Sequence, residues 1–207
     1  MSLDTYANLK LEIADFSHRD DIDLKIDTFI KLAEVEMFSN TEEVLKTRVL
    51  ETLDTSATTS SRLIALPTGY QSMRSMRLTI NSNTSNLRFR APEQLVRVDT
   101  SGLPRFFTVT SQIEFDRTPD AAYTVEFQYY AIPTGLSSSN TTNVVLTNNP
   151  NIYLFGALWA ALEWANETEL SQKWYIRFIN AIKGANKKDK EGRFGPAPAM
   201  RIEGSTP

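Results

Sequence analysis

Few residues in this chain have the type and spacing that enzyme chemistry requires. His18 is the only histidine, and it stands in the string His18-Arg19-Asp20-Asp21, which shares three letters with the catalytic loop of protein kinases. A kinase also needs a glycine-rich phosphate loop and metal ligands at set distances downstream, and the sequence has no such pattern. We therefore interpret this string as a turn between two helices, because Asp in particular suits turns and helix caps.

The sequence offers no cofactor motif and only a weak case for a metal. Asp20, Asp21 and Asp23 could supply carboxylates to calcium or magnesium, but the glycine and the distal glutamate of a calcium loop are missing. We favour helix capping for these three residues. Cysteine is absent, which excludes disulfides and thiolate chemistry, and no P-loop, dinucleotide fingerprint or GxSxG elbow occurs. We expect no cofactor and no metal, and we predict that the protein is not an enzyme.

Paired carboxylates leave one enzymatic alternative open. The pairs Glu34/Glu36 and Glu42/Glu43 could in principle act as acid and base in glycoside hydrolysis. The sequence cannot place them across a cleft, and such residues are usually exposed to solvent. A hydrolase that uses dispersed carboxylates is therefore the third of our hypotheses.

Composition and charge suit an ordinary globular protein with an uneven charge distribution. Of 207 residues, 41% are hydrophobic and 23% charged, and the net charge of -3 gives no overall signal for nucleic-acid binding. Residues 1–44 carry 11 acidic against 4 basic side chains, whereas residues 166–207 carry 8 basic against 5 acidic ones. An acidic front and a basic back can favour head-to-tail packing of copies; solvated helix faces are the alternative. The first 30 residues show no secretory pattern, so we expect an intracellular protein.

The spacing of apolar residues predicts helices at both ends of the chain. Two amphipathic stripes occupy residues 6–16 and 22–37, and we expect Thr5 or Asp4 to cap the first helix and Asp20 or Asp21 the second. Pro150, capped by Asn149, opens an almost wholly apolar helix that ends near Trp164 and must be buried on several sides. A further stripe from residue 170 to 182 predicts a second C-terminal helix, with Gly184 as its stop.

Between these helices the period of the pattern changes to that of strands. Short alternating stretches separated by polar turns run from about Lys46 onward, most clearly in Tyr123–Tyr130. The prediction is an α+β fold: an antiparallel helix bundle from the N- and C-terminal helices, an inserted antiparallel β-sheet or barrel domain, and an extended C-terminal tail. The expected bounds are 1–44 and 148–185 for the bundle, 45–147 for the β insert and 186–207 for the tail.

The helices supply a predicted bundle core, and the tail supplies a predicted docking segment. The expected core residues are Ile26, Phe29, Ile30, Tyr153, Leu154, Leu158, Leu162, Trp174 and Phe178. The expected docking residues are the cations and apolar anchors of the tail: Lys187, Lys188, Lys190, Arg193, Phe194, Met200 and Arg201. Such a tail can order in a groove of a protein partner, contact phosphates or remain solvated. The acidic residues among its cations argue against strong phosphate binding.

Several stretches, in this order and spacing, carry a family resemblance. They are Thr5–Lys10, Ile13–Phe16 with His18-Arg19, Ile26–Glu34, Leu66–Tyr70, Pro104–Val109, Tyr129–Pro133 with Leu136, and Asn149–Leu158. Together they resemble phage head–tail adaptor proteins of the short-tailed type, similar to tail tubular protein A type adaptors. The resemblance covers most of residues 5–184.

The resemblance implies a structural virion protein at the head–tail junction, made in the host cytoplasm. Adaptors of this kind form a ring of twelve copies below the portal protein and connect the capsid to the tail. Their helical parts build the ring, the C-terminal segment reaches the portal, and the β part faces the tail nozzle or tube protein. DNA passes through the channel without being read, and no membrane is involved. The resemblance carries no catalytic residues.

One binding alternative follows from the β region itself. This region is aromatic, and its loops are rich in Ser, Thr and Asn. Such a surface would also suit a carbohydrate- or receptor-binding module of a tail structure, which is the second hypothesis.

Overall fold

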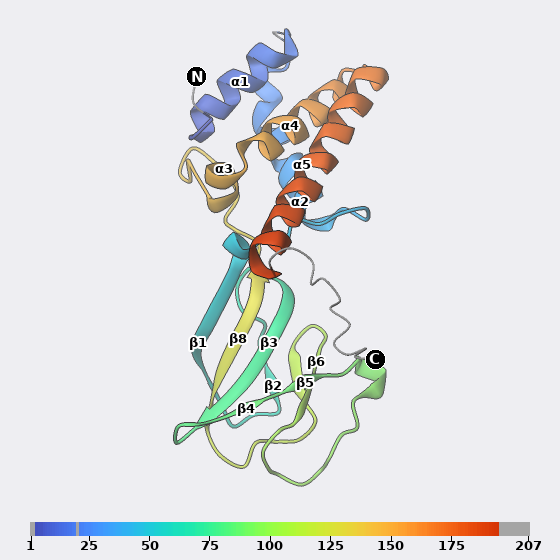
Figure 1. Cartoon of the computed structure of the whole chain (residues 1–207). Coiled ribbons are helices and arrows are strands. Elements are labelled where there is room, and N and C mark those ends of the chain that lie inside the picture. Colours follow the sequence, from blue (N-terminus) through green and yellow to red (C-terminus); the bar gives the residue numbers. More distant parts are fainter. Residues whose placement is uncertain (1–2, 20, 195–207) are drawn as a thin grey trace, which may run out of the picture. The chain divides into compact units, whose positions relative to one another are not determined.

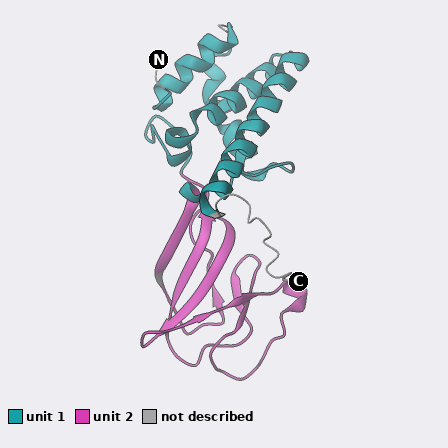
Figure 2. Ribbon diagram, viewed as in Figure 1, with its two compact units in different colours: residues 1–49, 134–207 teal, residues 50–133 magenta. Residues whose placement is uncertain are grey.

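The computed structural model describes residues 3–19 and 21–194, which belong to two compact units (Figures 1 and 2). Unit 1 comprises residues 1–49 and 134–207, and unit 2 comprises residues 50–133. Unit 1 is helical and unit 2 is built from strands, so the predicted α+β class is confirmed.

Unit 1 is arranged around one central helix. Its elements are α1 (Tyr6–Ser17), the 3-10 turn η1 (Asp23–Lys25), α2 (Ile26–Ser39), α3 (Val144–Asn148), α4 (Pro150–Trp164) and α5 (Thr168–Phe194). Helix α4 packs against α5, α2 and α1 (Figure 1). Because its apolar residues surround the helix, it has no face suited to water, and nine of its fifteen residues are buried.

The helix ends show which capping predictions were right. Thr5 caps α1, because its hydroxyl accepts a hydrogen bond from the N–H of Asn8 at 3.3 Å. Asp21 does not cap α2, which begins at Ile26 directly after η1. Pro150 does occupy the first turn of α4, but the side chain of Asn149 makes no capping hydrogen bond there.

Small residues let α4 approach its neighbours closely. Gly156 is buried, and a Cβ atom at this position would lie 2.8 Å from the Cβ of Ala33 on α2 and 2.9 Å from the ring of Phe178 on α5. On the α5 side, Trp159 packs against Tyr175 and Phe178, with ring centroids 5.3 and 6.4 Å apart. The alternation of small and aromatic residues on α4 therefore sets the spacing of three helices.

Unit 2 consists of two four-stranded sheets. The first has the order β1-β8-β3-β4 and is antiparallel; the second has the order β2-β7-β6-β5. The strands are β1 (Glu51–Thr59), β2 (Leu63–Ile64), β3 (Tyr70–Ile80), β4 (Asn83–Asn86), β5 (Arg88–Phe89), β6 (Phe106–Val109), β7 (Ile113–Phe115) and β8 (Tyr123–Ala131). Strands β5 and β6 pair in parallel, so the expectation of purely antiparallel pairing was wrong at this point. A long connection through residues 90–105 makes the parallel pairing possible, whereas a short turn would force an antiparallel one.

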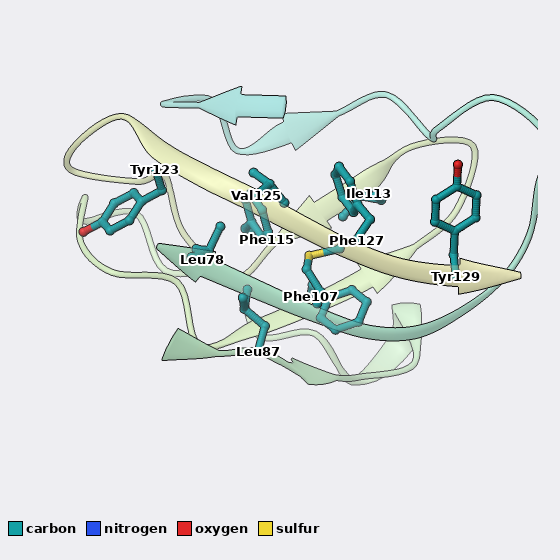
Figure 3. Close-up of a cluster of buried hydrophobic side chains, with 10 residues drawn as sticks. Leu78, Leu87, Phe107, Ile113, Phe115, Tyr123, Val125, Phe127 and Tyr129 are labelled. Carbon is teal, nitrogen blue, oxygen red and sulfur yellow. The ribbon is translucent and has the colours of Figure 1, made fainter. Parts of the chain in front are cut away.

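The core of unit 2 lies between the two sheets. Leu78 on β3 and Val125 and Phe127 on β8 point from one sheet toward Phe107 and Phe115 of the other (Figure 3). The alternation predicted for Tyr123–Tyr130 places Tyr123, Val125, Phe127 and Tyr129 on this buried face.

The observed unit 2 is narrower than the expected insert of residues 45–147. Residues 134–147, with α3, belong to unit 1. The segment is held there because Asn143 caps α3 and its amide donates to the hydroxyl of Tyr153 on α4 at 2.7 Å.

Candidate interaction sites

The turn around His18 is a structural connection. His18 is the C-cap of α1 in the left-handed conformation (φ 53°), and its N–H donates to the carbonyl oxygen of Asp15 at 3.2 Å. The neighbouring Arg19 donates to Asp21 at 2.7 Å and to Glu167 at 2.5 Å, which ties the turn to the α4–α5 connection. The hydrogen bond from Arg19 keeps the pKa of the Asp21 carboxyl below its ordinary value. The interpretation of His18 as a turn residue is confirmed.

The sequence candidates for a metal do not assemble into a site within the described part of the chain. Asp21 is paired with Arg19, and Asp20 lies outside the described residues. Across residues 3–19 and 21–194, no group of three or more His, Cys, Asp or Glu side chains could hold a metal ion. Over the same residues, every helix is too short or too polar to cross a membrane.

The predicted docking tail is partly a helix, which corrects its expected start at residue 186. Helix α5 continues for 27 residues to Phe194 and does not end at Gly184. Gly184 faces open space, so no packing contact is lost by the absence of a side chain there. A single glycine destabilises a helix but does not end it when packing contacts stabilise the helix on both sides. The extended conformation predicted for residues 186–194 was therefore wrong.

Asn186 is the first residue that holds this end of α5. Its side chain is buried, donates to the carbonyl oxygen of Val44 at 2.8 Å and to Glu43 at 2.6 Å, and accepts from the N–H of Lys46 at 2.9 Å. The Asn186 amide therefore forms hydrogen bonds with two backbone groups of the segment that follows α2, one as donor and one as acceptor. This contact joins residues 140 or more positions apart in the chain.

Asp189 is the second such residue. Its carboxylate accepts from the backbone N–H of Arg48 at 3.0 Å and from the guanidinium of Arg193, one turn further along α5, at 2.7 Å. Ile179, Ile182, Asn186, Asp189 and Arg193 follow one another at steps of three and four. This spacing is typical of one helix face and predicts a longer helix. The face changes from apolar to polar residues at Asn186, so the apolar periodicity alone does not reveal its continuation.

The structure does not bring the predicted docking residues together as one site. Lys187, Lys188 and Lys190 are exposed on α5, whereas Arg193 is turned toward Asp189. Phe194 closes the helix, and Met200 and Arg201 lie outside the described residues.

A polar network within unit 1, which the sequence reasoning missed, holds the segment that returns from unit 2. Glu34 on α2 accepts hydrogen bonds from the N–H of Leu136 at 2.7 Å and from the hydroxyl of Tyr153 at 2.9 Å. Gly135 lies so close that a Cβ atom there would be 2.7 Å from the Glu34 carboxylate. Burial, with the negative charge of Glu34, raises the pKa of Tyr153 far above its ordinary value, so its hydroxyl remains a donor.

The predicted bundle core is largely buried. Of its nine residues, Ile26, Phe29, Ile30, Tyr153, Leu154, Leu158, Leu162 and Phe178 are buried, and Trp174 is half-buried. Trp174 lies at the edge of unit 1, where it contacts Phe16 of α1 and Phe155 of α4 and carries Arg177 over its ring. It is therefore less completely covered than the other eight residues.

The profile of the SU10 adaptor protein family matches residues 4–201. The chain therefore belongs to the SU10 adaptor protein family, and its role is that of a structural adaptor protein of a phage virion. The resemblance to head–tail adaptors of short-tailed phages is thereby confirmed. A comparison with curated proteins gives no match.

Proposed function

We propose that this protein is a head–tail adaptor that assembles as a ring under the portal protein and connects the capsid to the tail. The ring contains twelve copies, as the family resemblance implies, and leaves a channel through which DNA passes without being read. The observation that carries the proposal is the family match, which includes unit 1, unit 2 and most of the C-terminal tail.

Helical unit 1 is the part of the protein suited to forming the ring. Its central helix α4 is buried among α1, α2 and α5, and the Asn186 and Asp189 contacts fix the far half of α5. A ring subunit has to keep its shape while it contacts two neighbours, and a tightly packed bundle does so. Unit 2 would then contact the tail nozzle or tube protein.

The C-terminal tail is the part suited to the portal, and the fold redefines where it begins. Residues 187–193 belong to α5, so the candidate segment for portal docking beyond this helix is 195–207, which includes Met200 and Arg201. Lys187, Lys188 and Lys190 are exposed next to its start and would contribute charge to the same contact.

Two truncations test this assignment against the portal protein encoded by the same phage. Deletion of residues 195–207 removes only the segment beyond α5, so the protein should fold as before and lose portal binding. Deletion of residues 188–207 also removes Asp189 and Arg193, so it should lower the stability of unit 1 as well.

Native mass measurement of the mixture with portal reads out both binding and stoichiometry, and circular dichroism reads out folding. The full-length protein should form a complex with twelve copies on one portal. Full-strength portal binding by the 1–194 chain would contradict the assignment of residues 195–207 to portal binding. A full-length protein that never binds portal would sink the proposed function itself.

A further inference from the structure

A small cavity in unit 1 is lined by three segments that are far apart in the sequence. It has a volume of about 310 Å³, and its walls come from the segment that follows α2, from the turn between α3 and α4, and from the last turns of α5. All of its lining residues belong to unit 1. We call it the polar cavity, after the polar side chains in its wall: Thr47, Arg48, Asn148, Asn149, Lys188 and Asp189.

Thr47 is the buried polar residue of this wall. It is 5% exposed, and its hydroxyl oxygen has no hydrogen-bond partner among the described residues. Buried hydroxyl groups in proteins nearly always have a partner, which is a protein group, an ordered water or a bound ligand. Because Thr47 lines the polar cavity, a polar group held inside the cavity can supply that partner.

Cations outnumber carboxylates around the polar cavity. Arg48 and Lys188 are exposed cations in its wall, and Asp189 is the one carboxylate among its lining residues. The charge of Asp189 is already compensated, because Arg193 donates to it at 2.7 Å and the Nε atom of Arg48 lies 3.7 Å from it. The cavity therefore has a positive electrostatic character, which favours an anion.

The other acidic residues of the two flanking segments do not cancel this charge. None of them lines the polar cavity, and each has a partner elsewhere. The pairs are Glu42 with Lys183, Glu43 with Asn186, and Glu191 with Lys187.

The turn between α3 and α4 adds a neutral donor. The side chain of Asn149 makes no capping hydrogen bond to α4, so its amide can donate into the polar cavity. Hydrogen-bond donors thus come from all three segments: Thr47 and Arg48 from the first, Asn149 from the second and Lys188 from the third. Such a set suits a ligand group that presents several oxygen atoms in different directions.

We propose that the polar cavity binds a phosphate group. Arg48 and Lys188 supply the opposite charge, and Thr47 and Asn149 supply hydrogen bonds. A tetrahedral phosphate can direct a separate oxygen to each of the three segments, whereas a carboxylate presents two oxygens in one plane. Arginine and lysine are also the side chains that commonly bind phosphate. The ligand is either free inorganic phosphate or a phosphate of the DNA backbone, and the inference does not depend on ring formation or portal binding.

A titration of the full-length protein with inorganic phosphate, in the absence of portal, tests the inference. Heteronuclear NMR of the isotope-labelled protein follows the side-chain amide of Asn149 and the backbone N–H groups of Arg48 and Gly192, all of which belong to the wall. These signals should shift to saturation with phosphate and not with chloride at the same ionic strength. Identical shifts with the two salts would overturn the inference.

Two neighbouring lysines give a matched pair of variants. Lys188→Gln removes a cation from the wall and should weaken phosphate binding about tenfold, because it removes a charge-assisted hydrogen bond. Lys187→Gln makes the same change one position earlier on α5, at an exposed residue that does not line the cavity. It should change the affinity by less than about twofold, since salt screens distant exposed charges. Equal weakening by both variants would indicate general charge attraction and would overturn the site.

Thr47→Val tests the buried hydroxyl separately from the fold. Valine keeps nearly the same shape, and the hydroxyl has no protein partner to lose, so the thermal stability without phosphate should not fall. Phosphate binding should weaken severalfold. Unchanged affinity would contradict the role of Thr47 in binding, and a loss of stability without phosphate would show that the hydroxyl has a structural partner.

Two further probes identify the source of the phosphate group. A short DNA duplex that shifts the same signals and is displaced by inorganic phosphate would support a backbone phosphate as the ligand. Shifts with inorganic phosphate alone would support the free anion. Malonate, a small dicarboxylate, is the test of the competing chemistry, and tighter binding of malonate than of phosphate would overturn the assignment.

Discussion

Substitution of Gly156 measures how tightly α4 is packed between its neighbours. An alanine Cβ at this position would lie 2.8 Å from the Cβ of Ala33 and 2.9 Å from Cε2 of Phe178, closer than real Cβ contacts. Neither atom can swing away, because Ala33 has no flexible end and the Phe178 ring is fully buried. Gly156→Ala must therefore push α2 or α5 outward, and overpacking of this kind costs about 1–3 kcal/mol.

The same substitution also brings a gain that has to be separated from this cost. Alanine is more favourable than glycine in a helix interior by about 1 kcal/mol, so the net loss for Gly156→Ala should be about 0–2 kcal/mol. Gly184→Ala is the matched control: it lies inside α5, and a Cβ there would meet nothing within 4 Å. It should stabilise unit 1 by about 1 kcal/mol. The two variants should thus differ by about 1–3 kcal/mol, although the chemical change is identical.

Tryptophan fluorescence during denaturant unfolding gives the free energies separately from unit 2. The chain has three tryptophans, Trp159, Trp164 and Trp174, and all of them lie in unit 1. A Gly156→Ala protein as stable as the Gly184→Ala protein would show that the helices have room at this point. Such a result would refute the close packing of α4 against α2 and α5 at Gly156.

Two further predictions concern polar groups. Glu34→Leu leaves the Leu136 N–H and the Tyr153 hydroxyl without their acceptor, so it should lower the free energy of unfolding of unit 1 by about 1–3 kcal/mol. Glu34→Gln keeps an acceptor oxygen and should lower this free energy less. Equal losses for the two variants in the fluorescence assay would contradict the network. In unit 2, hydrogen bonds from Arg97 lower the pKa of Glu114, so the stability from this pair is present above about pH 4.5 and is lost as pH falls through the folded-state pKa. Glu114→Gln should weaken the acid sensitivity of thermal unfolding followed by circular dichroism, and an unchanged pH profile would count against the pairing.

The elements predicted best from the sequence are those whose periodicity is long or is reinforced by end signals. The stripe in residues 6–16 became α1 with Thr5 as its cap, and Pro150 opened α4 as expected. The alternation of Tyr123–Tyr130 placed strand β8 with its correct buried face. In each case the pattern in the sequence and the packing partner in space favour the same structure.

The features that could not be predicted depend on contacts between distant residues. The last turns of α5 are stabilised by Asn186 and Asp189, whose partners follow α2, and no local pattern announces such pairs. The parallel pairing of β5 with β6 likewise depends on how the chain returns after residue 90. Trp174 has the right spacing for a core residue, but Phe16 of α1 and Phe155 of α4 cover it only in part. Tertiary contacts therefore determine the end of α5, the pairing of β5 with β6 and the burial of Trp174, which local sequence propensity does not specify.

The strands that connect the two units run next to each other. Unit 2 starts at residue 50 and ends at residue 133, and its first and last strands are paired, with Glu51 opposite Tyr130 and Thr52 opposite Tyr129. Because the two ends of the insert are held this close, another domain or a short turn could bridge them at little cost in chain entropy. Unit 2 can therefore be exchanged as a cassette. A recombination event that replaced residues 50–133 would leave the two chain ends of the helical unit in the same place.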